Sequence, residues 1–169
     1  MKLIKEVKEQ DINPDAVKVD ESNFSVREAA RGVCFDSDGK VPLLHVGLYG
    51  FHKLPGGGID YGEDVHQALA RELLEEIGCK AEVQSEIGEV IEHRNQFELV
   101  QKSYCFTAMI VGEKGQPDFT ESETEEQFSI VWADNLEHAI ELLESDDTSD
   151  YEGKFIKIRD LAILRAAAK

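Results

Sequence analysis

The sequence is poor in cysteine and basic residues, and it has no long apolar run. Its three cysteines are isolated, with no Cys-x-x-Cys pair, so they indicate neither a disulfide framework nor a zinc site. No stretch approaches the roughly 20 apolar residues of a membrane-spanning helix, and the N-terminus lacks the apolar core of a signal peptide. These absences predict a cytoplasmic protein in a reducing compartment, with no membrane partner.

Positive charge is scarce relative to negative charge. The 18 Lys and Arg residues against 35 Asp and Glu residues leave a net charge of −17, which repels a phosphate backbone and disfavours duplex nucleic acid as a partner. A small anionic ligand would need a cation between itself and the protein. A chain of 169 residues, 41% of them hydrophobic, is long enough to bury the core of a single domain spanning residues 1–169.

The hydrophobic periodicity predicts strands that interleave with helices. Strands are expected over residues 26–35, 41–48, 81–92, 99–111 and 128–133, with hairpin-turn chemistry at residues 36–39. Helical spacing is found in three sets: Val65, Leu69, Leu73 and Ile77; Leu136, Ile140 and Leu143; and Phe155, Ile158, Leu161 and Ala162. The acidic runs 121–126 and 144–150 are expected to be loops. This order predicts an α/β fold in which a mixed β-sheet lies between helices.

The most informative segment covers residues 54–79, LPGGGIDYGEDVHQALARELLEEIGC. The glycines Gly56–Gly58 follow Pro55, so the segment begins as a loop whose backbone can approach a ligand closely. A helix is expected over about 63–77, because acidic residues favour its first turn and Gly78 suits its end.

Three carboxylates of this helix, Glu72, Glu75 and Glu76, fall within an arc of about 100°. Like charges at such spacing weaken an isolated helix by about 0.2–0.5 kcal/mol per pair. If partly buried, each repulsion approaches about 3 kcal/mol at an effective dielectric of about 20. A positive group is therefore expected beside them, either Arg71 or a hard divalent cation such as Mg²⁺ or Mn²⁺. The alternative is that they form only a solvated acidic face.

The spacing favours a metal site over a solvated acidic face, because it matches the Nudix box G-x5-E-x7-R-E-U-x-E-E-x-G-U, in which U is bulky and apolar. The matching residues are Gly57, Glu63, Arg71, Glu72, Leu73, Glu75, Glu76, Gly78 and Cys79. Only Cys79 is atypical, and cysteine behaves as a small hydrophobe. A chance match anywhere in the chain has a probability on the order of 10⁻⁵. The chain therefore resembles the Nudix (MutT-like) hydrolases, and the resemblance extends over about residues 26–143, including Trp132.

The resemblance implies an α/β/α sandwich and metal-dependent hydrolysis of a nucleoside diphosphate linked to another group. It assigns Mg²⁺ or Mn²⁺ to Glu72, Glu75 and Glu76, with a backbone carbonyl at Gly56 or Gly57 completing the coordination. Such ions align the attacking water with phosphorus and neutralise the departing phosphate. The partner is then a small nucleotide, and a homodimer is left open because many relatives dimerise.

Supporting roles also follow from the resemblance. Arg71 is expected to orient a glutamate through a charge-assisted hydrogen bond rather than to touch substrate. Glu63 either orders the loop and the helix start or contacts metal through water. The general base is either a glutamate of the box or one from the acidic run 121–126, where Glu123 and Glu126 are the favoured candidates; the alternative is that this run is solvated loop.

Substrate identity is the least determined feature. Gly56, Gly57, Gly58 and Lys53 are expected to meet phosphate, with a solvated strand-end lysine as the alternative for Lys53. Tyr49, Phe51 and Phe97 stack on a base or belong to the core. Asn95 stands where ADP-ribose hydrolases tend to have proline, and elimination favours a nucleoside triphosphate-type substrate, with oxidised 8-oxo-dGTP as one example.

Two other functions stay open at this point. The first is a nucleotide- or metal-binding sensor that keeps the box without turnover. The second is an isomerase of prenyl diphosphates, which would need a catalytic cysteine. Cys34 and Cys105 lie in apolar strand stretches and are expected to be core residues.

Overall fold

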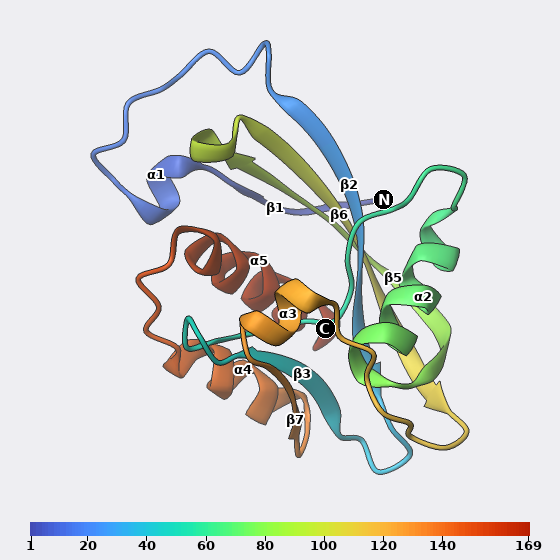
Figure 1. The fold of residues 1–169 in the computed structure, drawn as a ribbon. Helices are drawn as coiled ribbons and strands as arrows, with labels where there is room; N and C mark the ends of the chain where they lie inside the picture. The colour runs from blue at the N-terminus through green and yellow to red at the C-terminus, as the bar shows by residue number, and fades with distance from the viewer.

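The computed structural model describes residues 1–169 and arranges seven strands in two sheets, with helices packed against them (Figure 1). The first sheet has the order β1-β5-β6-β2, formed by Leu3–Val7, Lys80–Arg94, Leu99–Val111 and Ser25–Phe35. The second has the order β4-β3-β7, formed by Phe51–Lys53, Val41–Val46 and Phe128–Ala133. The helices are α1 (Glu9–Ile12), α2 (Val65–Ile77), α3 (Glu121–Glu125), α4 (Leu136–Ser145) and α5 (Tyr151–Ala167), with a 3-10 turn η1 (Asn95–Phe97). The predicted α/β class is confirmed.

The first sheet is mixed, as expected. Strands β5 and β6 run antiparallel, whereas β1 is parallel to β5 and β2 is parallel to β6. The second sheet is antiparallel throughout. All five expected strands are present, while β1 and β4 were not anticipated. Both are short, and the charged side chains within β1 hide its alternation.

The turn at residues 36–39 does not close a hairpin, so that expectation was wrong. The turn itself forms: the Asp36 carboxylate accepts hydrogen bonds from the amides of Asp38 and Lys40, at 2.9 and 2.8 Å. Its two flanking strands, however, belong to different sheets. The free edge of β2 is instead taken by the glycine loop, because the amide of Ala30 donates to the carbonyl of Gly57 at 2.9 Å.

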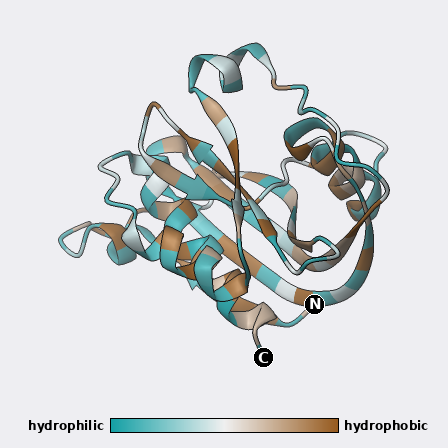
Figure 2. Ribbon diagram, turned by 90° about the horizontal axis from the view of Figure 1, so that it is seen from below, coloured by the Kyte–Doolittle hydropathy of each residue, from teal (hydrophilic) through white to brown (hydrophobic).

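Two hydrophobic cores lie on opposite faces of β2. On one face Cys34 belongs to the cluster that buries Leu73 of α2. On the other face Val33 belongs to the cluster that buries Phe155 of α5. Side chains alternate along a strand, and the alternating teal and brown bands of the long strands show this pattern (Figure 2). The helices α2 and α5 therefore approach the sheet from opposite sides.

The acidic run 121–125 forms helix α3, so the expectation of a loop was wrong there. Thr120 caps this helix: its amide donates to the Glu123 carboxylate at 2.8 Å, and its hydroxyl accepts from the Glu123 amide at 3.3 Å. A five-residue helix carries too little apolar periodicity to be found from the pattern. In the run 144–150, the chain is a loop only from residue 146, since α4 extends to Ser145.

None of the helices is long and apolar enough to cross a membrane.

Candidate active site

Helix α2 is fixed at both ends by its own sequence. The helix begins at Val65, two residues later than expected, and its N-cap is Asp64, whose carboxylate accepts from the amides of His66 and Gln67, both at 2.9 Å. At the other end Gly78 adopts the left-handed conformation with φ of 64°. A Cβ at this position would lie 2.7 Å from the backbone of Gln116.

The glycine loop is held between β2 and α2, where larger residues do not fit. Gly56 has φ of 127°, and a Cβ there would collide with the carbonyl of Ala30. A Cβ on Gly57 would collide with the carboxylate of Glu72. The glycines thus let the loop backbone lie directly against the acidic edge of the helix.

Arg71 is the centre of the acidic cluster. Its Nε donates to Glu63 at 2.8 Å, its Nη1 donates to Glu72 at 2.8 Å and to Glu75 at 3.1 Å, and its Nη2 donates to the carbonyl of Gly58 at 3.0 Å. The hydrogen bond to Glu63 is the main reason that the pKa of Arg71 is raised, and the same bond lowers the pKa of Glu63. Arg71 therefore contacts glutamates, as expected.

Glu76 is held separately from the other two helix carboxylates. It is only 3% exposed, it accepts a hydrogen bond from the amide of Gly56 at 2.5 Å, and it pairs with Nζ of Lys53 at 3.1 Å. Lys53 also lies 4.7 Å from the ring centroid of Phe128. The lysine expected to meet phosphate is thus placed beside the carboxylates, at the end of β4.

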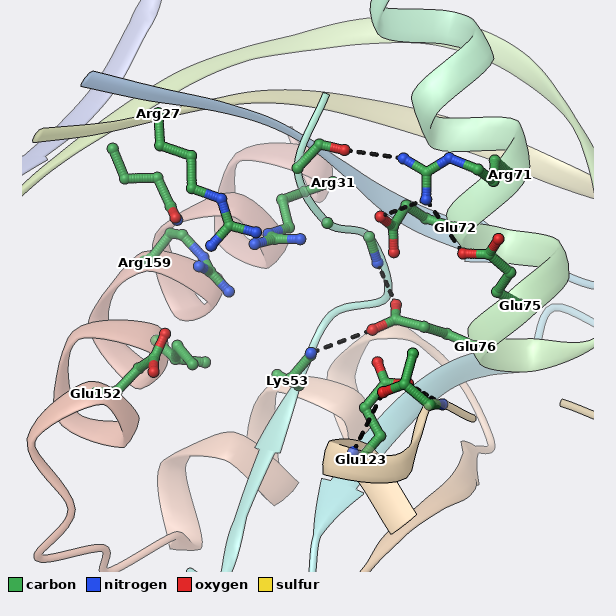
Figure 3. A pocket seen from close by; sticks show the side chains of 16 residues that line it. Arg27, Arg31, Lys53, Arg71, Glu72, Glu75, Glu76, Glu123, Glu152 and Arg159 are labelled. Carbon is green, nitrogen blue, oxygen red and sulfur yellow. Dashed lines mark hydrogen bonds and ion pairs between the residues drawn. The ribbon is translucent and has the colours of Figure 1, made fainter. Parts of the chain in front are cut away.

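These groups surround one cavity of about 300 Å³ (Figure 3). Its wall is formed by the acidic edge of α2, the glycine loop, α3, the first sheet, the end of β4 and α5. The lining residues are Arg27, Arg31, Lys53, Gly56, Gly57, Gly58, Arg71, Glu72, Glu75, Glu76, Gln101, Thr120, Glu123, Glu152, Ile156 and Arg159. The structure therefore brings all three predicted metal ligands, the three glycines and Lys53 to the same cavity.

The donor chemistry of the acidic edge suits a hard divalent cation. Burial raises the pKa of Glu72, the Arg71 hydrogen bond opposes that rise, and the charge of Glu76 adds to it. A divalent cation would relieve this repulsion. As the side chains stand, no group of three acidic, histidine or cysteine side chains converges as a metal site; Arg71 binds Glu72 and Glu75, whereas Lys53 binds Glu76. Binding of an ion would require these contacts to rearrange.

The two candidate general bases line different cavities. Glu123 lines the cavity described above, whereas Glu126 lines an adjoining cavity of about 290 Å³. The two cavities share Lys53, Glu152 and Ile156. Of the two favoured glutamates, Glu123 thus shares the cavity of the helix carboxylates.

The adjoining cavity is the more apolar of the two. Tyr49 and Phe97 line it and are 43% and 47% exposed, whereas Phe51, which also borders it, is buried. Of the two alternatives left open by the sequence, core packing describes Phe51. Tyr49 and Phe97 are accessible to a ligand.

The two cysteines that an isomerase could use are core residues, as expected. Cys34 and Cys105 are fully buried, and burial raises the pKa of each thiol to about 12. The reactive form of cysteine is the thiolate. Neither residue offers one to a ligand at neutral pH.

Seven lining residues were not anticipated from the sequence: besides Thr120 and Ile156, there are five polar or charged residues. Of these five, three come from the first sheet and two from α5: Arg27, Arg31, Gln101, Glu152 and Arg159. The available signal was the charge itself, since Arg31 interrupts an apolar strand and Arg159 interrupts an apolar helix face. Their convergence depends on α5 crossing the sheet, which no local pattern predicts.

Fold and site together define an α/β protein with a carboxylate-bearing helix beside a glycine loop. The NUDIX domain family model matches residues 26–169, and the chain belongs to this family. The match includes α5, which the sequence motif alone did not cover.

Individual relatives differ in what their names state. The chain is 36% identical, over 69 residues, to a protein of Bacillus subtilis (strain 168) named "Putative 8-oxo-dGTP diphosphatase"; this covers 41% of the chain and 44% of that relative, so less than half of the relative's length is matched. The solution structure of the E. coli ORF135 protein has a TM-score of 0.60 at 19% identity, covering 86% of this chain and 90% of that one. An ADP-ribose pyrophosphatase from Streptococcus suis 89-1591 has a TM-score of 0.54 at 20% identity, covering 85% and 92%. The structural likeness concerns the fold, and fold does not select a substrate.

Proposed function

We propose that this Nudix protein hydrolyses a phosphoric anhydride bond of a nucleoside triphosphate-type substrate, with oxidised nucleotides such as 8-oxo-dGTP among the candidates. One observation carries the proposal: the carboxylates of α2, the glycine loop and Lys53 line the same cavity, and an aromatic-lined cavity adjoins it. Carboxylates and cations in one cavity suit a metal-neutralised phosphate chain.

Mg²⁺ or Mn²⁺ would be held by Glu72, Glu75 and Glu76, with a backbone carbonyl of Gly56 as a further oxygen ligand. Such ions supply charge neutralisation and acidify water. The side chain of Arg71 keeps Glu72 and Glu75 at the cavity wall through its hydrogen bonds. Lys53 places a further positive charge where phosphate oxygens would lie.

Glu123 is the general base in this proposal. It would accept the proton of a water molecule whose oxygen attacks phosphorus, while the bridging P–O bond breaks and its electron pair leaves with the departing phosphate. Glu123 lines the cavity and already accepts hydrogen bonds from the amide and hydroxyl of Thr120, both at 2.8 Å. These bonds fix the position of its carboxylate.

The nucleoside is proposed to lie in the second cavity. Phe97 and Tyr49 offer aromatic surface for a base, and Lys53 and Ile156 border both cavities. A nucleotide could therefore span the two, with its base against the aromatics and its phosphates against α2. The name of the Bacillus subtilis relative adds support for an oxidised purine nucleotide.

A substrate panel tests the proposal. The purified chain, with Mg²⁺ or Mn²⁺, is incubated with nucleoside triphosphates, 8-oxo-dGTP, sugar nucleotides and dinucleotides, and both products are identified by liquid chromatography. Release of a nucleoside monophosphate from a triphosphate is expected. The exposed Glu141→Gln variant on α4, which lies in neither cavity, is a matched control. Binding without cleavage of any compound would favour the sensor alternative.

A further inference from the structure

Two arginines in the cavity have no carboxylate partner. Arg27 and Arg31 lie four residues apart on β2, and their side chains therefore point to the same face of the sheet. The guanidinium of Arg27 lies over Gly58, where a Cβ would be 3.1 Å from its Nη2, and it forms no ion pair within the chain. Both guanidiniums converge with that of Arg159 at one end of the cavity (Figure 3).

Arg31 is the more unusual of the two because it is buried. It is 6% exposed, its Nε has no hydrogen-bond partner, and its single hydrogen bond runs from Nη1 to the carbonyl of Ala30 at 3.5 Å. Burial and the nearby charge of Arg159 lower the pKa of Arg31 to about 10, so it is still a cation at neutral pH. A buried cation without a bonded counter-charge is costly to the folded state.

The nearby carboxylates are already engaged by other groups. One Glu92 oxygen accepts from Arg94 at 2.8 Å, and the other accepts from Gln101 at 2.9 Å. Asp160 accepts from Arg159 at 2.6 Å and from the amide of Leu54 at 2.8 Å. This end of the cavity therefore carries an excess of positive charge in a protein whose net charge is −17.

We infer that Arg27 and Arg31 form an anion-binding recess for a third phosphate of the substrate, beyond the two phosphates joined by the cleaved anhydride. This inference rests on the proposed function. The recess lies away from the aromatic cavity, because neither arginine lines that cavity. If the base of a nucleotide lies in the aromatic cavity and the two phosphates joined by the cleaved anhydride lie at α2, the next phosphate would reach the two arginines.

The chemistry selects the class of substrate. A guanidinium presents a planar fork of donors that matches phosphate, and the free Nε of Arg31 is one such donor. A nucleoside triphosphate brings a charged phosphate to this point. A sugar nucleotide brings neutral hydroxyls and leaves the buried charge of Arg31 unpaired. The recess therefore favours triphosphates over diphosphates and over sugar nucleotides.

Binding without metal tests the recess independently of turnover. The chain is titrated with inorganic triphosphate in excess EDTA, and binding is measured by calorimetry. Binding is expected, and Arg27→Gln and Arg31→Gln should each weaken the affinity by about tenfold or more. Arg165→Gln is the matched control, since Arg165 is an α5 arginine outside the cavity that pairs with Glu144 at 2.6 Å. Equal binding by wild type and both recess variants would overturn the inference.

Kinetics separate the recess from a general structural role. For one base, kcat/KM of the triphosphate is expected to exceed that of the diphosphate. Arg31→Gln should reduce kcat/KM for the triphosphate by about tenfold or more and leave that for the diphosphate little changed, while Arg31→Lys restores part of the loss. Equal losses on both substrates would contradict the inference.

The exposed Arg27 provides the variant that does not depend on core packing. If Arg31→Gln fails to fold, Arg27→Gln decides both experiments. Hydrolysis of diphosphates and triphosphates with equal efficiency, unaffected by Arg27→Gln, would reject the recess while the proposed hydrolase stands. Absence of all turnover, with intact binding of inorganic triphosphate that needs Arg27, would reject the hydrolase and keep the recess.

Discussion

Glu76 has the most constrained position of the three carboxylates on α2. The Gly56 amide fixes one of its oxygens and Lys53 neutralises the other. Glu72 and Glu75, by contrast, share Arg71. The cluster thus uses two separate cations, which reduce but do not remove the repulsion expected between like charges at i, i+4.

Replacing Glu76 by Gln tests its proposed role as a metal ligand. The variant preserves shape and removes one charge, and we expect kcat to fall by more than about 100-fold because metal charge stabilisation contributes several kcal/mol. Apparent Mn²⁺ affinity, followed by the paramagnetic signal of free Mn²⁺, should weaken in parallel. Glu141→Gln serves as the control, and turnover of Glu76→Gln at the wild-type rate would exclude this residue as a ligand.

The general base is tested by comparing Glu123 of α3 with Glu126, the C-cap residue of this helix. Glu123→Gln is expected to remove the acidic limb of the pH–rate profile and to lower kcat by about 10²–10⁴-fold. Glu126→Gln should retain that limb, since Glu126 lines the other cavity. Normal profiles in both variants would return the role to a glutamate of α2.

At the residue scale, the sequence predicts contacts between residues that are close along one helix. The spacing on one helix placed Glu72, Glu75 and Glu76 on one edge and Arg71 beside them. The pairing of Glu76 with Lys53 joins residues that are 23 positions apart, and Arg31 meets the cavity only because β2 lies beside the glycine loop. Such contacts depend on packing between elements, which local spacing does not encode.

At the scale of elements, α2 carries the site, and its end is fixed by Gly78. Gly78→Ala should destabilise the fold by more than about 2 kcal/mol, because it combines the strain of a left-handed residue, about 1–2 kcal/mol, with a clash at 2.7 Å against the backbone of residue 116. Gly39→Ala is the matched control, with φ of 80° but open space around its Cβ. Urea unfolding of both variants measures the difference, and equal losses would show that the clash contributes nothing.

The elements that were predicted correctly are long enough for their hydrophobic pattern to repeat several times. Helix α2 has 13 residues, an N-cap carboxylate and a terminal glycine, so three independent patterns agree. Helix α3 has only five residues and its capping box lies within an acidic run. The turn at residues 36–39 has the right residues for a hairpin, yet β2 pairs with β6 and the glycine loop, so turn chemistry alone did not determine strand pairing.

At the scale of the whole molecule, a buried network of charges joins the first sheet to α5. Glu92 of β5 accepts from Arg94 and from Gln101 of β6, and its Oε2 lies 3.4 Å from Arg159 of α5. Burial opposes ionisation of Glu92, but the charges of Arg159 and Arg94 outweigh it, so its pKa is lowered. No sequence pattern indicates this network, because its members come from three elements that meet only after folding.

The network makes stability depend on acidity in a defined direction. A glutamate whose pKa is lower in the folded state than its ordinary value of 4.5 stabilises the fold above that value, and the stabilisation is lost as pH falls through the lower folded pKa. The free energy of unfolding should therefore decline below about pH 4.5 in wild type. Glu92→Gln should lose about 3–5 kcal/mol at pH 7, since its arginines are left buried without their counter-charge.

The same variant should also depend less on pH than wild type in the acid range, so the two curves converge as pH falls. Urea unfolding between pH 3 and 7 measures both curves. Glu141→Gln removes one carboxylate from an exposed position and should run parallel to wild type, because no buried arginine loses its partner. Since Arg159 of this network lines the cavity, a Glu92→Gln curve parallel to wild type would mean that the recess is held by packing alone and not by the charges of the network.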